Sequence, residues 1–282
     1  MKIESYINKY SIVSVNPEQT NFKWHFEIVG RKDAPPLLWL HGFMGSGMDW
    51  LVLVETHFSE FCNILVDLPG HGESQITESM NYLELLDSLT EQLHLEGMQN
   101  FIPIGYSMGG RLAMHLYDSF PESIPAMILV SSSPGLKTEI ERAERINSDN
   151  VLMDKMEHMG IEAFLQEWYR LPLFQNIAQN PDLFDNLVET RSNNSPMQLR
   201  RSLEILGTGA LPSCWEKLPD WDIPVLLISG SSDSKYCEIN AEMAGEFPRS
   251  EHVIIEEGDH AIHIEKALET AVAIRHFVRA SI

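Results

Sequence analysis

The chain has 282 residues, of which 44% are hydrophobic and 22% charged, which suits one globular α/β domain with an insertion, or at most two domains. It carries 41 acidic against 20 basic residues, a formal net charge of −21. A surface this acidic repels nucleic acid and anionic membranes, so both are excluded as partners. It also disfavours a polyanionic substrate unless the site supplies local positive charge.

Two features predict a cytoplasmic protein. The three cysteines, Cys62, Cys214 and Cys237, are odd in number and far apart, so we expect free thiols in a reducing compartment. The first residues contain no apolar signal region, and no apolar run is long enough to span a bilayer.

The first predicted elements are strands. Ser11–Val15 is a short β-like run, and Phe22–Ile28 alternates apolar with polar side chains. We expect these residues, before Pro35, to form an additional hairpin at the edge of a sheet. Leu37–Leu40 is a continuous apolar strand, and the glycine-rich loop 41–47 follows it, which brings backbone amides close to a ligand.

Strands and helices then alternate along the chain. This alternation predicts a mostly parallel central sheet with helices on both faces, and an active site at the carboxyl ends of the strands. The predicted strands are Asn63–Val66, Phe101–Ile104, Ala126–Val130, Pro224–Gly230 and His252–Glu256, and the predicted helices are Met48–Phe58, Tyr82–Leu93, Leu112–Tyr117 and Ile262–Val278.

The alternation breaks between residues 134 and 220, where no strand is evident. Glu139–Asn147, Glu162–Tyr169 and Pro181–Arg191 have helical patterns, and proline suits the first position of a helix. We therefore expect residues 134–220 to form a helical cap inserted into a core domain of residues 1–133 and 221–282.

The segment Gly105-Tyr106-Ser107-Met108-Gly109 lies between a buried strand and a helix, which is the context of a nucleophile elbow. A serine hydroxyl needs an imidazole to take its proton and a carboxylate to orient that imidazole. Asp233 follows the penultimate strand and His260 the last strand, so both should meet Ser107 at one edge of the sheet. The order Ser107, Asp233, His260 is that of the α/β-hydrolase fold.

Other acids and histidines fit these roles less well. Asp259 adjoins His260 in sequence, so its side chain should diverge from the imidazole. His41 and His71 follow earlier strands, where histidines more often organise loops, and His263 should face the start of the closing helix.

Backbone amides of Phe43 and Met108 should form an oxyanion hole, one in the loop after the earlier strand and one directly after the serine. The sequence contains no His-Glu-x-x-His or Cys-x-x-Cys pair, so we expect no metal. We expect no organic cofactor either, because no Gly-x-Gly-x-x-Gly follows the first buried strand.

Arg111 lies four residues after Ser107, on the same helical face. It also lies near the positive end of that helix, where a cation is mildly unfavourable. The residue therefore serves either an anion beside the serine or a surface carboxylate, and the pattern alone does not separate these alternatives.

Two further groups of arginines lie in the predicted cap. Arg142 and Arg145 follow glutamates at helical spacing, with Glu141 four residues before Arg145, so the pattern favours a solvated helix face with ion pairs. Arg191 ends a predicted helix, where a cation complements the helix dipole.

The chain resembles the 2-succinyl-6-hydroxy-2,4-cyclohexadiene-1-carboxylate synthase (MenH) family of menaquinone and phylloquinone biosynthesis, from about residue 37 to 265. Some of the matching motifs are common to many α/β-hydrolases, and the more specific ones lie in the cap. The common motifs are 41–43, 67–72 and 105–111, and the specific ones are 134–136, 141–145 with 148–149, 168–169, 172–174 and 191–194. Matches at 233–236 and 258–260 complete the set.

This resemblance implies a carbon–oxygen lyase without a cofactor. The family eliminates pyruvate from 2-succinyl-5-enolpyruvyl-6-hydroxy-3-cyclohexene-1-carboxylate to give 2-succinyl-6-hydroxy-2,4-cyclohexadiene-1-carboxylate. Ser107, activated by His260 and Asp233, would act as a base rather than as an acylated nucleophile.

The resemblance also implies how this small anionic polycarboxylate is bound. Arg111, Arg145 and Arg191 would bind its three carboxylates, since an arginine fork matches a carboxylate. Arg142 is an alternative to Arg145. Tyr106 would flank the serine, and Trp168 would line the pocket.

Two other functions use the same residues. A carboxylesterase or thioesterase would need the same triad, but an apolar acyl substrate has no use for three arginines. A non-catalytic binding protein would not need an intact serine, acid and histidine. The sequence leaves open whether the chain is a monomer or a small homo-oligomer, and whether the pathway ends in menaquinone or phylloquinone.

Overall fold

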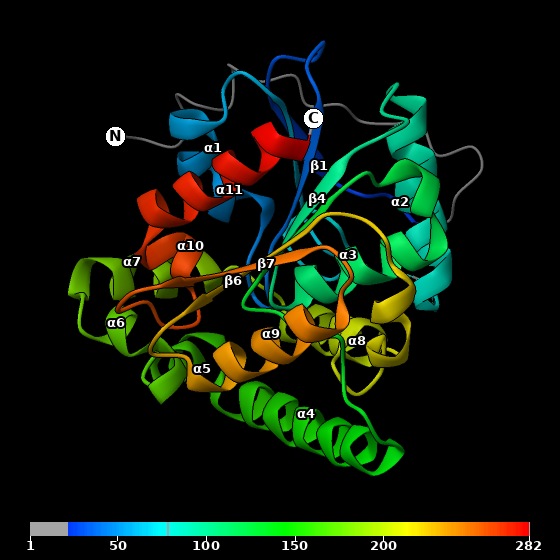
Figure 1. Ribbon diagram of the computed structural model, residues 1–282. Helices are drawn as coiled ribbons and strands as arrows, with labels where there is room; N and C mark the ends of the chain where they lie inside the picture. The colour runs from blue at the N-terminus through cyan, green and yellow to red at the C-terminus, as the bar shows by residue number, and fades with distance from the viewer. Residues whose placement is uncertain (1–21, 78, 282) are drawn as a thin grey trace.

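The computed structural model describes residues 22–77 and 79–281, and its centre is one seven-stranded sheet (Figure 1). The strands lie in the order β1-β3-β2-β4-β5-β6-β7. Only β1 runs antiparallel to its neighbour, so the predicted mostly parallel sheet is confirmed. The strands are β1 (Phe26–Gly30), β2 (Pro36–Leu40), β3 (Cys62–Val66), β4 (Ile102–Tyr106), β5 (Met127–Val130), β6 (Val225–Gly230) and β7 (Ser250–Ile255).

The central strands are buried along their whole length, because helices cover both faces of the sheet. Every residue of β3, β4, β5 and β6 is buried, as expected for a parallel sheet whose strands are continuous apolar runs. Helices α1 and α11 contact each other on one face, and α2 and α3 contact each other on the other (Figure 1). The helices and 3-10 turns of the predicted core are η3 (Gly47–Trp50), α1 (Leu51–His57), α2 (Tyr82–Leu95), α3 (Met108–Ser119), η4 (Pro121–Ser123), α9 (Ser234–Glu246), α10 (Ile262–Glu265) and α11 (Ala267–Ser281), and the turn η6 (Trp215–Asp220) lies at the end of the predicted cap.

The edge of the sheet differs from the prediction at the start of its first strand. Phe22 and Trp24 are buried and alternate with more exposed neighbours, as expected, but β1 begins only at Phe26. Pairing stops there because the partner strand β3 ends at Val66 and the chain turns away into a loop. The predicted strand Ser11–Val15 lies outside the described residues.

Two predicted single helices are interrupted. The segment predicted as Met48–Phe58 starts as the 3-10 turn η3 before it becomes α1. The closing helix is divided into α10 and α11, because Lys266 has the non-helical dihedrals φ −128° and ψ 47°.

Residues between β5 and β6 form a layer of helices over one end of the sheet (Figure 1). Helix α4 runs twelve residues beyond its predicted end at Asn147, because Ser148 Oγ donates to Glu144 O and Asp149 pairs with Arg145, so neither polar side chain ends the helix. Helix α8 was not predicted, and Pro196 occupies its first turn. The helices and turn of this layer are α4 (Glu139–Met159), α5 (Ile161–Trp168), η5 (Pro172–Phe174), α6 (Gln175–Ala178), α7 (Pro181–Arg191) and α8 (Pro196–Leu206). We keep the name cap for residues 134–220, and the division into core and cap stays a prediction.

Candidate active site

Ser107 lies at a sharp turn between β4 and α3. Its φ of 50° and ψ of −105° are outside the regions that non-glycine residues favour, so the turn holds it under strain. A Cβ at Gly105 would lie 2.4 Å from Gly109 O, and one at Gly109 would lie 2.3 Å from Leu40 O, so both positions need glycine. Ser132 Oγ donates to Ser107 O at 2.8 Å and steadies the turn from the loop after β5.

The structure brings Ser107, His260 and Asp233 together. Ser107 Oγ lies 3.2 Å from His260 Nε2, and His260 Nδ1 lies 2.7 Å from Asp233 Oδ2. Asp233 is at the N-cap of α9, where its other oxygen accepts from Tyr236 N. The carboxylate is therefore held at both oxygens, and it fixes the imidazole with Nε2 toward the serine.

The alternative residues have other partners. Asp259 Oδ2 accepts from Asn176 N at 2.6 Å, so this carboxylate diverges from His260 as predicted. His41 Nε2 accepts from Leu68 N at 2.8 Å, which makes this buried histidine an organiser of the neighbouring loop. His263 is part of α10 and packs between the rings of Trp50 and Tyr106, at centroid distances of 4.5 and 4.1 Å.

Phe43 and Met108 both line the cavity beside Ser107. Met108 is the first residue of α3, so its N–H has no acceptor within the helix. Phe43 lies in the loop after β2, which precedes the serine turn in the sequence. Both residues therefore lie beside Ser107, and their assignment to an oxyanion hole stays a prediction.

The cavity has a volume of about 220 Å³ and lies between the serine turn and the cap. Predicted residues Tyr106 and Trp168 both line it. Its wall is mostly aromatic and aliphatic, with a small set of charged groups. The lining residues are Phe43, Tyr106, Ser107, Met108, Arg111, Arg145, Asp149, Leu152, Trp168, Tyr169, Leu173, Phe174, Ile177, Arg191, Leu203, Thr208, Lys235, Tyr236, His260, Ala261 and Ile264.

Arg111 is a buried cation without a carboxylate partner among the described residues. Its side chain lines the cavity, and only 5% of the residue is exposed. Burial lowers the pKa of Arg111 to about 10, and the charge of Arg145 acts in the same direction, whereas the neighbouring Tyr236 hydroxyl and the Asp149 carboxylate oppose this shift. The surface-carboxylate alternative is therefore wrong, and the binding of an anion by Arg111 stays a prediction.

The structure separates Arg145 from Arg142. Arg145 lines the cavity and donates from Nε to Asp149 Oδ1 at 2.8 Å, one turn further along α4. Arg142 donates to Gly209 O and, at 3.2 Å, to Ala210 O, and it is turned away from the cavity toward the chain after α8.

The expected pair between Glu141 and Arg145 is not formed. Glu141 instead completes a capping box with Thr138, accepting from its N–H at 2.9 Å, so its carboxylate is held at the start of α4.

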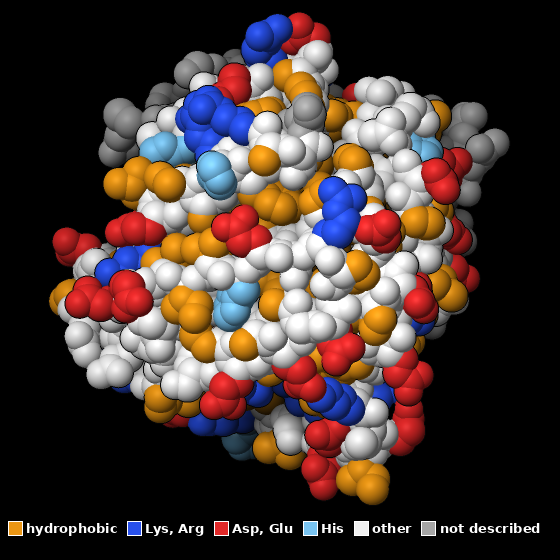
Figure 2. Space-filling model, viewed as in Figure 1, with side chains coloured by type: hydrophobic (Ala, Val, Ile, Leu, Met, Phe, Trp, Pro, Cys, Tyr) orange, Lys and Arg blue, Asp and Glu red, His pale blue; other side chains and the backbone are white. Residues whose placement is uncertain are grey.

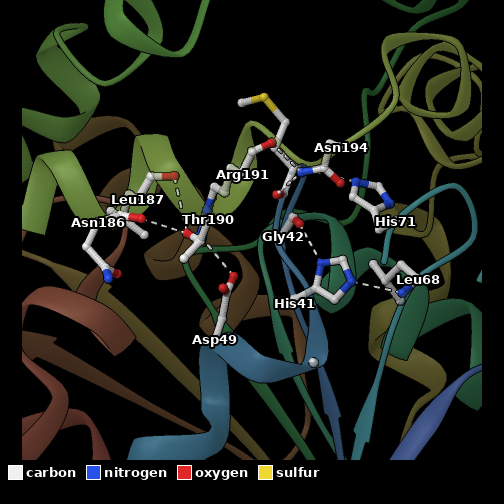
Figure 3. Close-up of polar contacts among 12 residues, drawn as sticks. His41, Gly42, Asp49, Leu68, His71, Asn186, Leu187, Thr190, Arg191 and Asn194 are labelled. Carbon is white, nitrogen blue, oxygen red and sulfur yellow. Dashed lines mark hydrogen bonds and ion pairs between the residues drawn. The ribbon is translucent and has the colours of Figure 1, made fainter. Parts of the chain in front are cut away.

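Arg191 lies at the end of α7 and lines the cavity from the cap side. It donates from Nη2 to Asp49 Oδ2 at 2.9 Å (Figure 3). Its guanidinium lies 5.5 Å from the centre of the Tyr169 ring. The side chain is only 9% exposed. The arginine at this helix end therefore serves a buried ion pair rather than only the helix dipole.

Sequence reasoning missed several residues of the site. Tyr236 packs on His260 at a ring distance of 4.5 Å, and Phe174 lies 6.0 Å from the same imidazole. Both belong to segments that match the family motifs, so the sequence marked these positions but assigned them no role in the site. Asp149 also belongs to a matching motif, four residues after Arg145. Asp49 had no such signal, because it is defined by Arg191, which it meets only in the folded chain.

No helix within residues 22–77 and 79–281 is both long and apolar enough to cross a membrane. Within the same ranges, no group of three or more His, Cys, Asp and Glu side chains is placed to hold a metal ion.

Residues 35–267 match the family with the alpha/beta hydrolase fold, so the chain is a member of this class. It is 36% identical over 246 residues to a Bacillus subtilis (strain 168) protein provisionally named 2-succinyl-6-hydroxy-2,4-cyclohexadiene-1-carboxylate synthase, covering 84% of this chain and 88% of the relative. It is 30% identical to the synthase of Escherichia coli O1:K1 / APEC, covering 89% and 96% of the two chains. Within the class, the chain belongs to the 2-succinyl-6-hydroxy-2,4-cyclohexadiene-1-carboxylate synthase family.

A solved structure agrees with this assignment. The structure of MenH from S. aureus superposes with a TM-score of 0.85 at 30% sequence identity, covering 92% of this chain and 98% of that one.

Proposed function

We propose that the protein is the carbon–oxygen lyase that eliminates pyruvate from 2-succinyl-5-enolpyruvyl-6-hydroxy-3-cyclohexene-1-carboxylate, in menaquinone or phylloquinone biosynthesis. One observation carries the proposal beyond family membership. Three arginines, Arg111, Arg145 and Arg191, line the same cavity as Ser107 and His260. A substrate with three carboxylates has a use for this set, whereas an apolar ester does not.

The Ser107 hydroxyl starts the reaction as a base. His260 Nε2 takes the serine proton while Asp233 stabilises the imidazolium that forms. The serine oxygen then removes the proton from the ring carbon next to the succinyl carbonyl. The electron pair of that C–H bond moves into the carbonyl as an enolate, whose oxygen the Phe43 and Met108 amides stabilise.

Collapse of the enolate completes the elimination. The ring double bonds shift to the conjugated diene as the C–O bond to the enolpyruvyl group breaks. The departing enolpyruvate takes up a proton and becomes pyruvate, and the serine and histidine return to their starting states. No acyl-enzyme forms, because the serine oxygen bonds only to a proton.

The local charge of the cavity differs in sign from that of the whole surface. Figure 2 shows acidic side chains spread over the visible face of a protein with a net charge of −21. Of the three arginines that line the cavity, Arg145 pairs with Asp149 and Arg191 pairs with Asp49, which is not part of the lining, whereas Arg111 has no acidic partner within 4 Å among the described residues. We assign Arg111 to a substrate carboxylate near the reacting carbon, because Arg111 follows Ser107 by one helical turn.

We also place the enzyme in the cytoplasm. The three cysteines are free thiols, and two of them, Cys62 and Cys214, are buried. Free thiols are typical of proteins that fold in a reducing compartment.

The decisive experiment supplies the enolpyruvyl substrate to the purified enzyme and measures pyruvate and the cyclohexadiene product together. We expect both in equal amounts, and their loss in Ser107→Ala. Rapid turnover of p-nitrophenyl esters without pyruvate release would instead identify an esterase. Full activity of Ser107→Ala would contradict the assignment of the base.

A further inference from the structure

Met44 is a strained residue beside the proposed oxyanion hole. It directly follows Phe43, is completely buried and has a φ of 65°, in the left-handed region that residues with a Cβ rarely adopt. Such a conformation persists only where the surroundings hold it. Gly45 N donates to Gly42 O at 3.0 Å, so Phe43 and Met44 are the two central residues of one tight turn. The contacts that hold Met44 in this turn therefore also hold the peptide between Gly42 and Phe43, which carries the Phe43 N–H.

Both backbone polar groups of Met44 are held by side chains. Its N–H donates to His71 Nε2 at 3.0 Å, and its carbonyl accepts from Asn194 Nδ2 at 2.9 Å (Figure 3). His71 Nδ1 lies 3.2 Å from Pro69 O, which suits the tautomer whose Nε2 is an acceptor. Burial lowers the pKa of His71 to about 3, so this acceptor persists at neutral pH.

The two partners of Met44 come from different parts of the molecule. His71 belongs to the core, whereas Asn194 lies in the cap, just after α7, and is separated from Met44 by 150 residues. Asn194 lines a second, polar hollow together with Met44 and Asp49, and Arg191 lines both this hollow and the active cavity. The Asn194 amide therefore contacts the loop 41–47 without being part of the lining of the active cavity.

We propose that Asn194 is a positioning residue that fixes the Phe43 amide of the oxyanion hole by holding the Met44 carbonyl from the cap. This inference rests on the proposed function, because it assigns Phe43 to that hole. It gives the cap a second task besides supplying arginines. When the cap is seated, the loop 41–47 is held in the conformation that stabilises the enolate.

A variant of Asn194 should therefore lose turnover rather than substrate affinity. Asn194→Ala and Asn194→Asp both remove the donor to Met44 O, and the Asp side chain has nearly the same shape as Asn. We expect kcat for pyruvate release to fall by about 10- to 100-fold, with KM within about threefold of the wild-type value. Thermal melting of each variant establishes that it is folded. If the Ala variant does not fold, the Asp variant decides the test.

Asn193→Ala is the matched control. Asn193 is exposed and donates only within its own turn, to Thr190 O at 3.2 Å, so we expect wild-type kcat. An equal loss in this control would overturn the proposal, as would kcat within about twofold of wild type in the Asn194 variants. A rise in KM at unchanged kcat would also overturn it, because Asn194 Nδ2 also donates to Arg191 O at 3.1 Å and would then act through that arginine.

The two proposals fail in different ways. If the wild-type enzyme releases no pyruvate, the proposed function is wrong, and the same variants are compared on p-nitrophenyl acetate. Ester hydrolysis passes through a tetrahedral intermediate that uses the same hole. A kcat loss confined to the Asn194 variants there would keep the positioning role, and equal rates would overturn it.

Discussion

Arg191 in the cap donates a hydrogen bond to Asp49 in the core across 2.9 Å, and the two side chains are 9% and 14% exposed (Figure 3). Burial by itself lowers the pKa of Arg191, but Asp49, followed by Tyr169 and Tyr106, raises it above its ordinary value. The carboxylate of Asp49 thus keeps this guanidinium charged beside the cavity.

Removing the charge of Asp49 should destabilise the free enzyme. Asp49→Asn leaves the buried Arg191 without its counter-ion, which costs about 3 kcal/mol. Replacing both residues, as Asp49→Asn with Arg191→Met, should restore much of this loss, because no uncompensated charge remains. A double-mutant cycle of unfolding free energies measures the coupling. Strictly additive effects would show that the two side chains do not stabilise each other.

Arg111 should oppose stability while it supports activity. Arg111→Met removes a buried cation that no described carboxylate pairs, so we expect a higher Tm together with a fall in kcat/KM of about 100-fold on the enolpyruvyl substrate. Arg111→Lys keeps the charge but loses the planar fork, so its kcat/KM should lie between those of Met and wild type. Thermal melts and steady-state kinetics of the three proteins test this. A destabilised, fully active Met variant would remove Arg111 from the site.

The two arginines of α4 should have separable roles. Arg145→Ala should raise KM by about tenfold, because Arg145 lines the cavity and its loss removes one charged contact to the substrate. Arg142→Ala should lower Tm and leave KM unchanged, because Arg142 donates to the carbonyls of Gly209 and Ala210. The contrary result, a KM effect for Arg142 and a Tm effect for Arg145, would reverse the assignment.

Local sequence predicted the elements that depend on neighbouring residues. The turn around Ser107 was predictable because its glycines, the apolar strand before it and the helix after it are contiguous. Asp233 and His260 were predictable because they directly follow strands, and parallel strands end at one edge of a sheet.

The parts that sequence did not predict depend on contacts between distant segments. Asp49 and Arg191 are 142 residues apart, and nothing in either segment indicates the other. The length of α4 was underestimated for a related reason. Ser148 and Asp149 resemble a helix end until their hydrogen bonds to the preceding turn are known.

A partly buried carboxylate supports the loop that carries His260. Glu265 Oε1 accepts from Asp259 N at 3.0 Å, and Asp259 in turn accepts from Asn176 N in the cap. Burial raises the pKa of Glu265 to about 7, and the neighbouring Asp259 charge adds to this, whereas Asn176 and Lys266 oppose it.

The raised pKa of Glu265 predicts a pH-dependent stability. The ordinary value of the group is 4.5, so the folded state binds this proton more tightly than the unfolded chain does. The stability that protonated Glu265 contributes to the folded state is fully present below pH 4.5 and is lost as the pH rises through 7. Glu265→Gln removes this loss of stability at high pH. The Tm of the variant minus that of wild type should therefore grow by a few degrees between pH 5 and 8.5. The corresponding change in unfolding free energy is about 1–2 kcal/mol after allowance for solvent screening. Glu269→Gln, exposed on α11, is the control and should show a constant difference, and parallel Tm curves for Glu265→Gln and wild type would refute the assignment.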